Sequence, residues 1–456
     1  MTIVTITLIL IIALFVLLGS GLWVGLSLIG SAWIASEFLT TKNLQTGANM
    51  VSEIWASSSS WTLTALPMFV WMGEILFRTR LSEDMFRGLS PWLARLPGGL
   101  VHTNIVGCTV FAAVSGSSAA TLTTVGKMSI PELRARDYPE NMVIGTLAGA
   151  ATLGLMIPPS LALIVYGVTV NESITKLFFA GVFPGLILAG MFMAYVAVVS
   201  KTSNNWNPKV ESGMSFADKL KNSRFLIPVF ALILVVIGSM YMGYATATEA
   251  SAIGVIGALL LAASQRSLTW QSFSASLMGA MRTSAMIALI LAGAAFLKQS
   301  MGFTGIPRAL ADWIAVLDLS RFQLLMALLV FYIILGMFLD GISAVVLTMA
   351  VVEPMVRGAG IDLIWFGIFV VVVVEMAQIT PPIGFNLFVL QGMTNHEMGY
   401  ITKAALPMFL IMVLMFSGSH VAISGTAIKM KTINTMIRNI GSAALVMYPI
   451  SWFVMP

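Results

Sequence analysis

The stretches Ile157-Pro-Pro-Ser160 and Thr380-Pro-Pro-Ile383 hold the only two Pro-Pro pairs of the chain, which lie 223 residues apart. Proline removes a backbone donor and interrupts a helix, so each pair predicts a break within an apolar helix. Pro-Pro pairs also occur at ordinary helix ends, but a shared offset favours an internal duplication. Two further pairs of prolines have the same offset: Pro131 with Pro354, and Pro184 with Pro407.

The residues around these stretches are strongly apolar. Hydrophobic residues make up 58% of the 456-residue chain and charged residues 9%, with a mean hydropathy of +0.94. Soluble proteins carry about 25% charged residues. This composition excludes a soluble enzyme, a disordered protein and a disulfide scaffold, and the single Cys108 allows no internal disulfide. The apolar residues form long runs, which predicts an all-α polytopic membrane protein rather than a β-barrel.

Most of the apolar runs are long enough to span a bilayer. The residues from Met1 to Trp33 carry no charged side chain. They lack the basic n-region of a signal peptide, so we expect them to form a membrane helix that is not cleaved off. The runs 97–131 and 322–357 are interrupted by small residues and prolines, and we expect them to enter the membrane and turn back. The expected spans and apolar stretches are 3–18, 21–35, 60–77, 141–168, 176–200, 225–242, 247–264, 275–297, 362–391, 404–424 and 442–455.

Basic residues orient these elements. Segments 78–95 and 201–224 carry four and five Lys or Arg residues, so the positive-inside rule places both on the cytoplasmic side. An even number of crossings must then separate them, which makes 97–131 a re-entrant hairpin. When the membrane crossings after residue 224 are counted in the same way, the hairpin 322–357 enters from the side opposite to that of the hairpin 97–131. Two copies of one unit in opposite orientations are an inverted repeat, of the kind found in secondary transporters. The expected domains are 1–95 (scaffold), 96–200 (first repeat), 201–320 (cytoplasmic loop and scaffold), 321–424 (second, inverted repeat) and 425–456 (atypical C-terminal tail).

Oxygen atoms at the first hairpin and the first break form a candidate cation site. The hairpin contains Ser115-Gly-Ser-Ser118, and the prolines at 158 and 159 are expected to leave the carbonyls from Gly154 to Ile157 without amide donors. Sodium prefers such hard oxygen ligands, and irregular backbone at membrane depth is tolerated where it is buried or lines a cavity. Close packing of small residues is the alternative interpretation.

The second copy offers charged candidates. The offset relates Ser117 to Asp340, and Thr380 adds a hydroxyl beside the second break. An intramembrane carboxylate is a functional candidate, although Asp340 could instead cap the hairpin near water. Glu375 lies one turn before the second break, where its carboxylate could support an ion site or have a purely structural role. Glu74 and Arg78 are four residues apart and predict a structural ion pair.

At these motifs the sequence resembles the large membrane subunit of TRAP (tripartite ATP-independent periplasmic) transporters, over about residues 1–415. The resemblance implies no enzyme activity, and no nucleophile with a partner His or Asp surrounds Ser115-Gly-Ser117. The segments that carry the resemblance are Leu66–Glu74, Ser115–Thr121, Ile130–Leu133, Ile157–Ser160, Gly336–Asp340 and Ile379–Gly384.

The resemblance implies a multi-pass protein of the bacterial inner membrane, working as a sodium-driven elevator transporter. It implies uptake of an organic acid, such as a dicarboxylate, sialic acid or keto acid. A periplasmic binding protein would deliver this substrate, and a small four-helix membrane subunit, encoded as a separate polypeptide, would join the scaffold. A stand-alone sodium/dicarboxylate symporter and, less in keeping with the motifs, an ion channel are the alternatives.

The resemblance also implies site residues. Sodium would be the coupling ion, at two or more sites, and no organic cofactor is implied. Substrate would lie between the hairpin tips, where helix N-termini favour a carboxylate. The implied residues are Ser115, Ser117, Gly154, Ile157 and Pro159 for the first sodium site, Asp340, Gly341 and Thr380 for the second, and Ser118, Ser160, Ser343 and Asn386 for the substrate.

The C-terminal end departs from the family pattern. About 30 residues follow the span 404–424, and they include Lys429, Lys431 and Arg438 ahead of the apolar stretch 442–455. The predicted topology places these basic residues outside, against the positive-inside tendency. An extra helix, a lineage-specific extension and an artificial extension are all compatible with the sequence.

Overall fold

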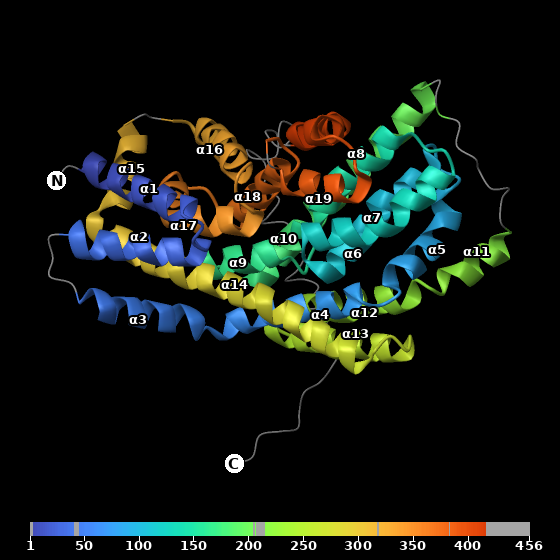
Figure 1. The fold of residues 1–456 in the computed structure, drawn as a ribbon, viewed down its shortest axis with the longest axis horizontal. Coiled ribbons are helices and arrows are strands. Elements are labelled where there is room, and N and C mark those ends of the chain that lie inside the picture. The colour runs from blue at the N-terminus through green and yellow to red at the C-terminus, as the bar shows by residue number, and fades with distance from the viewer. Residues whose placement is uncertain are drawn as a thin grey trace, which may run out of the picture. The chain divides into compact units, whose positions relative to one another are not determined.

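The computed structural model describes residues 3–40, 45–203, 206, 215–316, 319–382 and 384–415, and every regular element in these ranges is a helix (Figure 1). The elements discussed below belong to one unit, Met1–Phe409, except that the last helix, Met398–Met415, continues past its end. The expected tail 425–456, the stretch 442–455 and the end of the span 404–424 lie outside the described residues.

A layer of long helices forms one side of this unit, where α2, α3 and α14 lie side by side (Figure 1). Glycines let α2 and α14 approach closely: a Cβ placed on Gly293 would lie 2.6 Å from the carbonyl oxygen of Gly25. Small residues allow this kind of contact between apolar helices. The helices before the first hairpin are α1 Ile3–Gly19, α2 Val24–Phe38, α3 Thr46–Ser58, η1 Trp61–Thr64, α4 Ala65–Phe77 and α5 Leu81–Leu93.

The two repeats have the same order of helices. Adding 223 to the bounds of α7, Ser118–Ala135, gives those of α17, Gly341–Gly358, and both Pro-Pro bonds are cis. The first repeat comprises η2 Gly99–Val101, α6 His102–Ser115, α7, α8 Glu140–Thr152, η3 Leu153–Leu155, α9 Leu161–Val170 and α10 Ile174–Thr202. The second comprises α16 Arg321–Gly336, α17, α18 Leu363–Gln378, α19 Phe385–Thr394 and the helix Met398–Met415.

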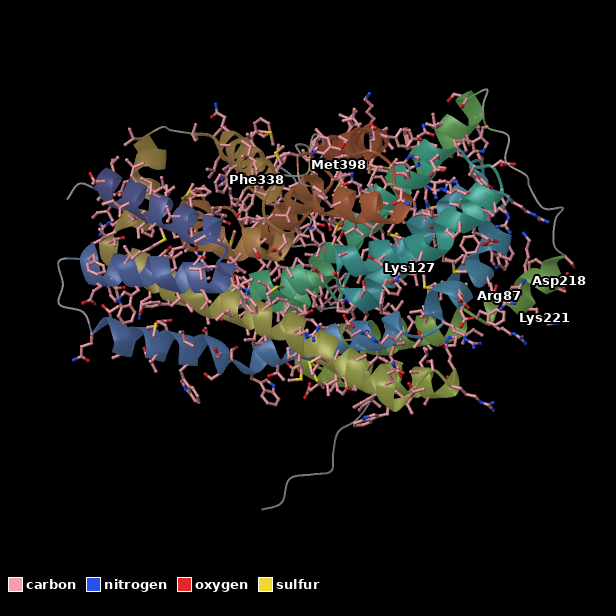
Figure 2. All side chains as sticks on the ribbon, in the orientation of Figure 1. Arg87, Lys127, Asp218, Lys221, Phe338 and Met398 are labelled. Atoms are coloured by element: carbon pink, nitrogen blue, oxygen red, sulfur yellow. The ribbon has the colours of Figure 1, made fainter. Side chains whose placement is uncertain are left out.

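Between the repeats lie α11 Phe216–Ser223, α12 Ile227–Tyr241, α13 Ala247–Ser264, α14 Trp270–Thr304 and α15 Ile306–Val316. The helix α11 packs on α5, where the Trp92 indole N–H donates to the Ser223 hydroxyl at 2.8 Å. Figure 2 shows Arg87 of α5 near Asp218 and Lys221 of α11. The two basic segments therefore meet, which agrees with the prediction that both lie on the same side of a membrane.

The lengths of the helices support a membrane protein with several spans. Five described helices are long and apolar enough to cross a bilayer, and two bent pairs bring the number to seven if each pair is one span. The sequence analysis missed α3, α5, α11 and α15 because their polar positions lower their mean hydropathy. The long helices are Ile174–Thr202, Ala247–Ser264, Trp270–Thr304, Gly341–Gly358 and Met398–Met415; the bent pairs are Thr46–Ser58 with Trp61–Phe77 and Phe216–Ser223 with Ile227–Tyr241.

An ion cluster ties the first repeat to the segment after α19. The Glu140 carboxylate at the start of α8 pairs with Arg134 and lies 3.0 Å from the His396 ring nitrogen. Burial pushes the pKa of Glu140 upward, but the hydrogen bonds and charges of Arg134 and His396 outweigh it and hold the pKa below its ordinary value. The ionised form of Glu140 is therefore favoured by folding.

We expect the Gly293→Ala variant to unfold at a lower temperature than the wild type, because its Cβ would overlap the Gly25 carbonyl oxygen. Overpacking of this kind costs about 1–3 kcal/mol. The matched control is Gly302→Ala on the same helix, where a Cβ would have no neighbour within 4 Å and helix propensity favours alanine. Thermal unfolding in detergent checks the pair. Equal melting temperatures for both variants would contradict the close crossing of α2 and α14.

The stabilising contribution of Glu140 should depend on pH in a defined direction. Because its folded pKa is depressed, the contribution is complete above the ordinary value of 4.5 and is lost as the pH falls through the lower folded value. Glu140→Gln should cost up to about 1 kcal/mol near neutrality and nothing at the acidic end. Unfolding at graded pH measures this difference. The control Glu397→Gln removes a neighbouring carboxylate outside this cluster and should leave the pH profile unchanged.

Candidate functional site

The first hairpin turns at Gly116, whose φ of +62° lies in the left-handed region that glycine adopts readily. The next residue, Ser117, caps α7 by accepting the Ala120 amide at 3.4 Å. The hydroxyls of Ser115 and Thr121 lie 2.9 Å apart, and Thr121 also donates to the Ser117 carbonyl at 2.8 Å. The turn therefore gathers hydroxyl and carbonyl oxygens in a buried place.

The first break packs directly on this turn. The Leu161 amide at the start of α9 donates to the Gly116 carbonyl at 3.3 Å. A Cβ on Gly116 would lie 2.6 Å from the Pro159 carbonyl oxygen, and one on Gly154 would lie 2.7 Å from the Ser117 carbonyl oxygen. Four of the five residues implied for the first sodium site, Ser115, Ser117, Gly154 and Pro159, are thus brought together.

The carbonyls before the first break are less free than the sequence suggested. The Ser160 hydroxyl donates to the Leu155 carbonyl and accepts the Leu163 amide at 3.2 Å, so it caps α9 and occupies one of the expected free carbonyls. The Leu155 carbonyl, one of those expected to lack an amide donor, therefore accepts a hydroxyl group instead and is not free to bind a cation. The Ile157 side chain faces α10, with its Cγ1 2.8 Å from a Cβ placed on Gly185.

The second hairpin turns at Asp340, which caps α17 by accepting the Ile342 and Ser343 amides at 3.1 Å each. Asp340 therefore caps the second helix of the hairpin, which was the structural alternative to an ion-binding role. The Thr380 hydroxyl donates to the Met376 carbonyl at 2.7 Å and so keeps its lone pairs available as ligands. Within the described part of the chain, no hydrogen bond joins Asp340 to Thr380.

The tip of the second hairpin touches both breaks. A Cβ on Gly341 would lie 2.8 Å from Gln378 Nε2, two residues before Thr380, and 3.2 Å from Leu155 Cδ1 in the first break. Of the residues implied for the second sodium site, Gly341 therefore lies close to the segment that carries Thr380. The implied substrate residue Ser343 is buried in the first turn of α17.

The first hairpin also touches the second break, through a pair of implied substrate residues. The Asn386 side-chain amide donates to the Ser118 hydroxyl at 2.6 Å, and the Ser118 Oγ and Asn386 Oδ1 atoms are 3.0 Å apart. Both side chains are buried, at 3% and 0% exposure. Each hairpin tip is therefore in contact with both breaks, and the N-termini of α7, α9, α17 and α19 meet in one region.

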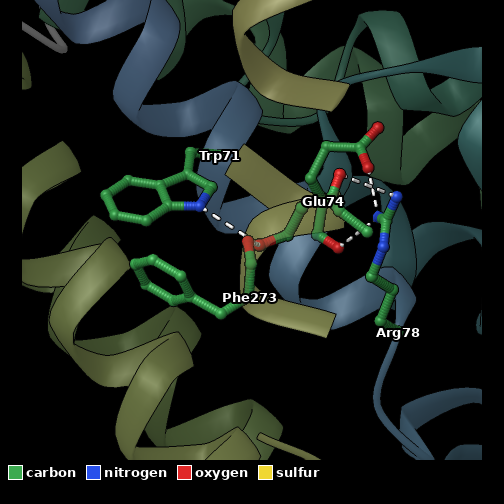
Figure 3. Close-up of polar contacts among 6 residues, drawn as sticks. Trp71, Glu74, Arg78 and Phe273 are labelled. Atoms are coloured by element: carbon green, nitrogen blue, oxygen red, sulfur yellow. Dashed lines mark hydrogen bonds and ion pairs between the residues drawn. The ribbon is translucent and has the colours of Figure 1, made fainter. Parts of the chain in front are cut away.

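The predicted ion pair of Glu74 and Arg78 lies where α4 packs on α14. Arg78 pairs with Glu74 as predicted and donates to the Ala275 carbonyl at 3.2 Å, while Trp71 donates to Ser276 at 3.3 Å (Figure 3). These contacts join α4 to α14 and serve the scaffold.

The sequence analysis missed an ion network at Glu353. This carboxylate lies 2.7 Å from the Lys298 amine and 3.0 Å from the Arg357 guanidinium, and so joins α17 to α14. The spacing of Glu353 and Arg357 by four residues on one helix was the available signal.

A double-mutant cycle tests the Ser118–Asn386 contact. Ser118→Ala leaves the Asn386 amide buried without its partner, which should cost about 1–3 kcal/mol of stability. Adding Asn386→Leu removes the unpaired group, so the double variant should lose less than the sum of the single changes. Thermal unfolding of the four proteins gives the coupling. Strict additivity would mean that the first hairpin and α19 are not joined by this contact.

The sequence matches the DctM component of tripartite ATP-independent periplasmic transporters over residues 11–421. Similar proteins include an isethionate TRAP permease, DctMQ, of Oleidesulfovibrio alaskensis, 30% identical over 404 residues, which are 88% of this chain and 62% of that protein. The C4-dicarboxylate permease DctM of Pseudomonas aeruginosa is 29% identical, over 80% of this chain and 85% of its own length. The sialic acid permease SiaM of Vibrio cholerae is 29% identical, over 86% and 91%.

The fold is also similar to that of a solved transporter. The YdaH transporter of Alcanivorax borkumensis superposes with a TM-score of 0.61, at 15% sequence identity, over 88% of this chain and 97% of that one. At this identity the likeness concerns the fold alone. The family match covers most of the chain, and the matched relatives are transporter permeases rather than enzymes. This protein therefore belongs to the DctM family of TRAP transporter large permeases, which are multi-pass membrane proteins.

Proposed function

We propose that this chain is the large membrane subunit of a sodium-coupled transporter that takes up an organic acid across a bacterial inner membrane. The observation that carries the proposal is the meeting of two hairpin tips and two helix breaks in one region. Broken helices that meet near the middle of a bilayer are the usual binding sites of secondary transporters with inverted repeats. We assign the two repeats opposite orientations and an elevator movement against the α2–α3–α14 scaffold.

The first hairpin and break fit a sodium ion. Here the ligands would be the Ser115 hydroxyl and backbone oxygens around Ser117, Gly154, Ile157 and Pro159. Contacts within hydrogen-bond distance already gather two of these oxygens, the Ser115 hydroxyl and the Ser117 carbonyl, with the Thr121 hydroxyl. All are hard, uncharged ligands, so a bound monovalent cation would bring a net charge of +1 to the site.

A second sodium ion fits the second hairpin and break less completely. Asp340 would supply a carboxylate, Gly341 a carbonyl, and Thr380 the lone pairs that its bond to Met376 leaves available. Asp340 already accepts two amides, and a carboxylate has about four lone-pair sites, so capping and cation binding are compatible.

The helix ends fit a carboxylate substrate. The N-termini of α7, α9, α17 and α19 meet here, and each contributes the positive end of a helix dipole, which the Asp340 carboxylate partly offsets at α17. Ser118, Ser160, Ser343 and Asn386 lie in or beside the first turns of these helices and would provide polar contacts. The names of the relatives include C4-dicarboxylate and sialic acid, which are carboxylates, and isethionate, which is a sulfonate; all are organic anions, which supports an anionic substrate.

A tripartite assembly follows from the family. The partners would be a small four-helix membrane subunit and a periplasmic substrate-binding protein. Sodium can power accumulation, because each positive charge moving down 100 mV releases about 2.3 kcal/mol. A stand-alone symporter would need no binding protein, and the uptake experiment below distinguishes the two.

Sodium should stabilise the purified protein. A ligand that binds only the folded state adds about 2.7 kcal/mol at a concentration a hundredfold above its Kd. We therefore expect a higher melting temperature in sodium chloride than in choline chloride. Ser115→Ala, which removes the proposed ligand hydroxyl of the first site, and Asp340→Ala should reduce this difference. The control Ser52→Ala, exposed on α3, should retain it.

Transport itself is measured in proteoliposomes that contain the small subunit, with labelled succinate, sialic acid and isethionate as probes. Uptake of one probe against its gradient should require an imposed sodium gradient and the binding protein. Uptake that is indifferent to sodium would overturn the coupling, and sodium-driven uptake without a binding protein would favour a stand-alone symporter. An unchanged sodium effect in both site variants would overturn the site assignment alone.

A further inference from the structure

A glutamate of α18 lies buried without a partner. The Glu375 side chain has 0% exposure, and neither carboxylate oxygen has a hydrogen-bond partner. The preceding five residues, 370–374, are all valine, and each is buried. An isolated carboxylate charge in such surroundings is very costly, so the group must either pair with a cation or take up a proton.

A second unpaired acceptor lies one turn further along. Gln378 has 5% exposure, and its side-chain carbonyl oxygen also has no partner. Residues three apart on a helix are neighbours on its surface, so Glu375 and Gln378 can reach one another. All three unpaired atoms are acceptors, and among the described residues no donor, the Gln378 amide nitrogen included, forms a hydrogen bond with them.

The first repeat has no such pair. The offset of 223 relates Glu375 to Thr152 and Gln378 to Leu155. The Thr152 hydroxyl donates to the Gly149 carbonyl at 2.7 Å, so this side chain has its hydrogen-bond partner within its own helix. The unpaired acceptors are thus a feature that the second copy has and the duplicated architecture does not require.

The charged and titratable groups of the helices packed against α18 have other roles. Within the described ranges, no ion pair or hydrogen bond joins any of them to Glu375. Tyr166 donates to the Leu363 carbonyl, Tyr332 pairs with Thr348, and Lys176 and Lys201 lie near the two ends of α10. The others are Tyr195 on α10, Arg321 at the start of α16, Glu353 and Arg357 in their ion network, Asp340 and Asp362 as helix caps, and Glu140 in its ion cluster.

We propose that Glu375 is a proton-binding site, in which the protonated carboxyl group donates a hydrogen bond to the Gln378 side-chain carbonyl. The proton comes from water and forms an O–H bond on one carboxylate oxygen, and no other bond changes. One proton satisfies two of the three acceptors and removes the charge. A sodium ion would need more oxygen ligands than this valine-rich surface supplies.

The site lies where it can affect transport. Gln378 Nε2 is the polar atom closest to Gly341 at the tip of the second hairpin, 2.8 Å from a Cβ placed there. When Glu375 is protonated, its hydrogen bond to the Gln378 side-chain carbonyl fixes the orientation of the Gln378 amide. The Nε2 atom of this amide then stays directed at the tip of the second hairpin. Loss of the proton frees that side chain and leaves a buried charge beside the second break. This inference does not depend on the identity of the transported substrate or the coupling ion.

Infrared spectroscopy of the full-length protein in lipid tests the proposal without substrate or partner subunits. A protonated carboxyl group has a carbonyl stretch separate from the amide bands, which moves when the sample is transferred to heavy water. We expect this band at neutral pH in the wild type and its loss in Glu375→Gln. The control Glu83→Gln removes an exposed glutamate and should keep the band. Gln378→Leu should move the band to higher frequency, because the hydrogen bond is lost.

Three outcomes would overturn the proposal: no such band at neutral pH, a band that survives Glu375→Gln, or a band seen in choline chloride that sodium chloride abolishes. The last outcome would make Glu375 a sodium ligand. If Glu375→Gln fails to fold, Glu375→Asp serves instead, since a shorter acid in the same place should shift the band. A failure here would leave the sodium-gradient experiment untouched, and the reverse also holds.

Discussion

The structure depends on one constraint: a backbone polar group inside a bilayer must find its partner within the protein. A hairpin turn and a broken helix each leave such groups without partners, and here they satisfy one another. The Leu161 amide at the first break donates to the Gly116 carbonyl at the first hairpin tip. This bond requires the two backbones to approach closely, which explains glycine at 116 and 154, where a Cβ would overlap a carbonyl oxygen.

The same arrangement creates opposite partial charges side by side. Helices that begin at the tips and after the breaks point their free amides into one region, while the turns before them present carbonyl and hydroxyl oxygens. A cation bound to the oxygens would hold the tips in place and favour an anion at the amides. By thermodynamic linkage the anion would favour the cation to the same degree. Coupling of a cation to a carboxylate then needs no separate device.

Much of this architecture could be predicted from the sequence, because the two Pro-Pro pairs mark helix breaks, whereas the single prolines at 131, 184 and 354 lie within helices. The offset of two Pro-Pro pairs predicted a duplication, and the bounds of α7 and α17 obey it to the residue. The contacts between repeats could not be predicted. Nothing in the local sequence shows that Ser118 pairs with Asn386, 268 residues away, or that Ser160 binds the Leu155 carbonyl. Helices with polar positions, such as α3 and α15, also escaped a hydropathy criterion designed for lipid-facing spans.

The two repeats share a backbone plan but not its charges. Ser117 in the first hairpin corresponds to Asp340 in the second, and Thr152 before the first break to Glu375 before the second. At these two positions the first copy has neutral hydroxyl side chains, while the second has acidic groups, one capping a helix and one without a partner. Since a buried charge is tolerated only with a counter-charge or a proton, occupancy of the second copy controls its electrostatics. On the proposals made above, the duplication supplies the geometry, and the acidic residues at 340 and 375 would make one half responsive to the cation or proton that it binds.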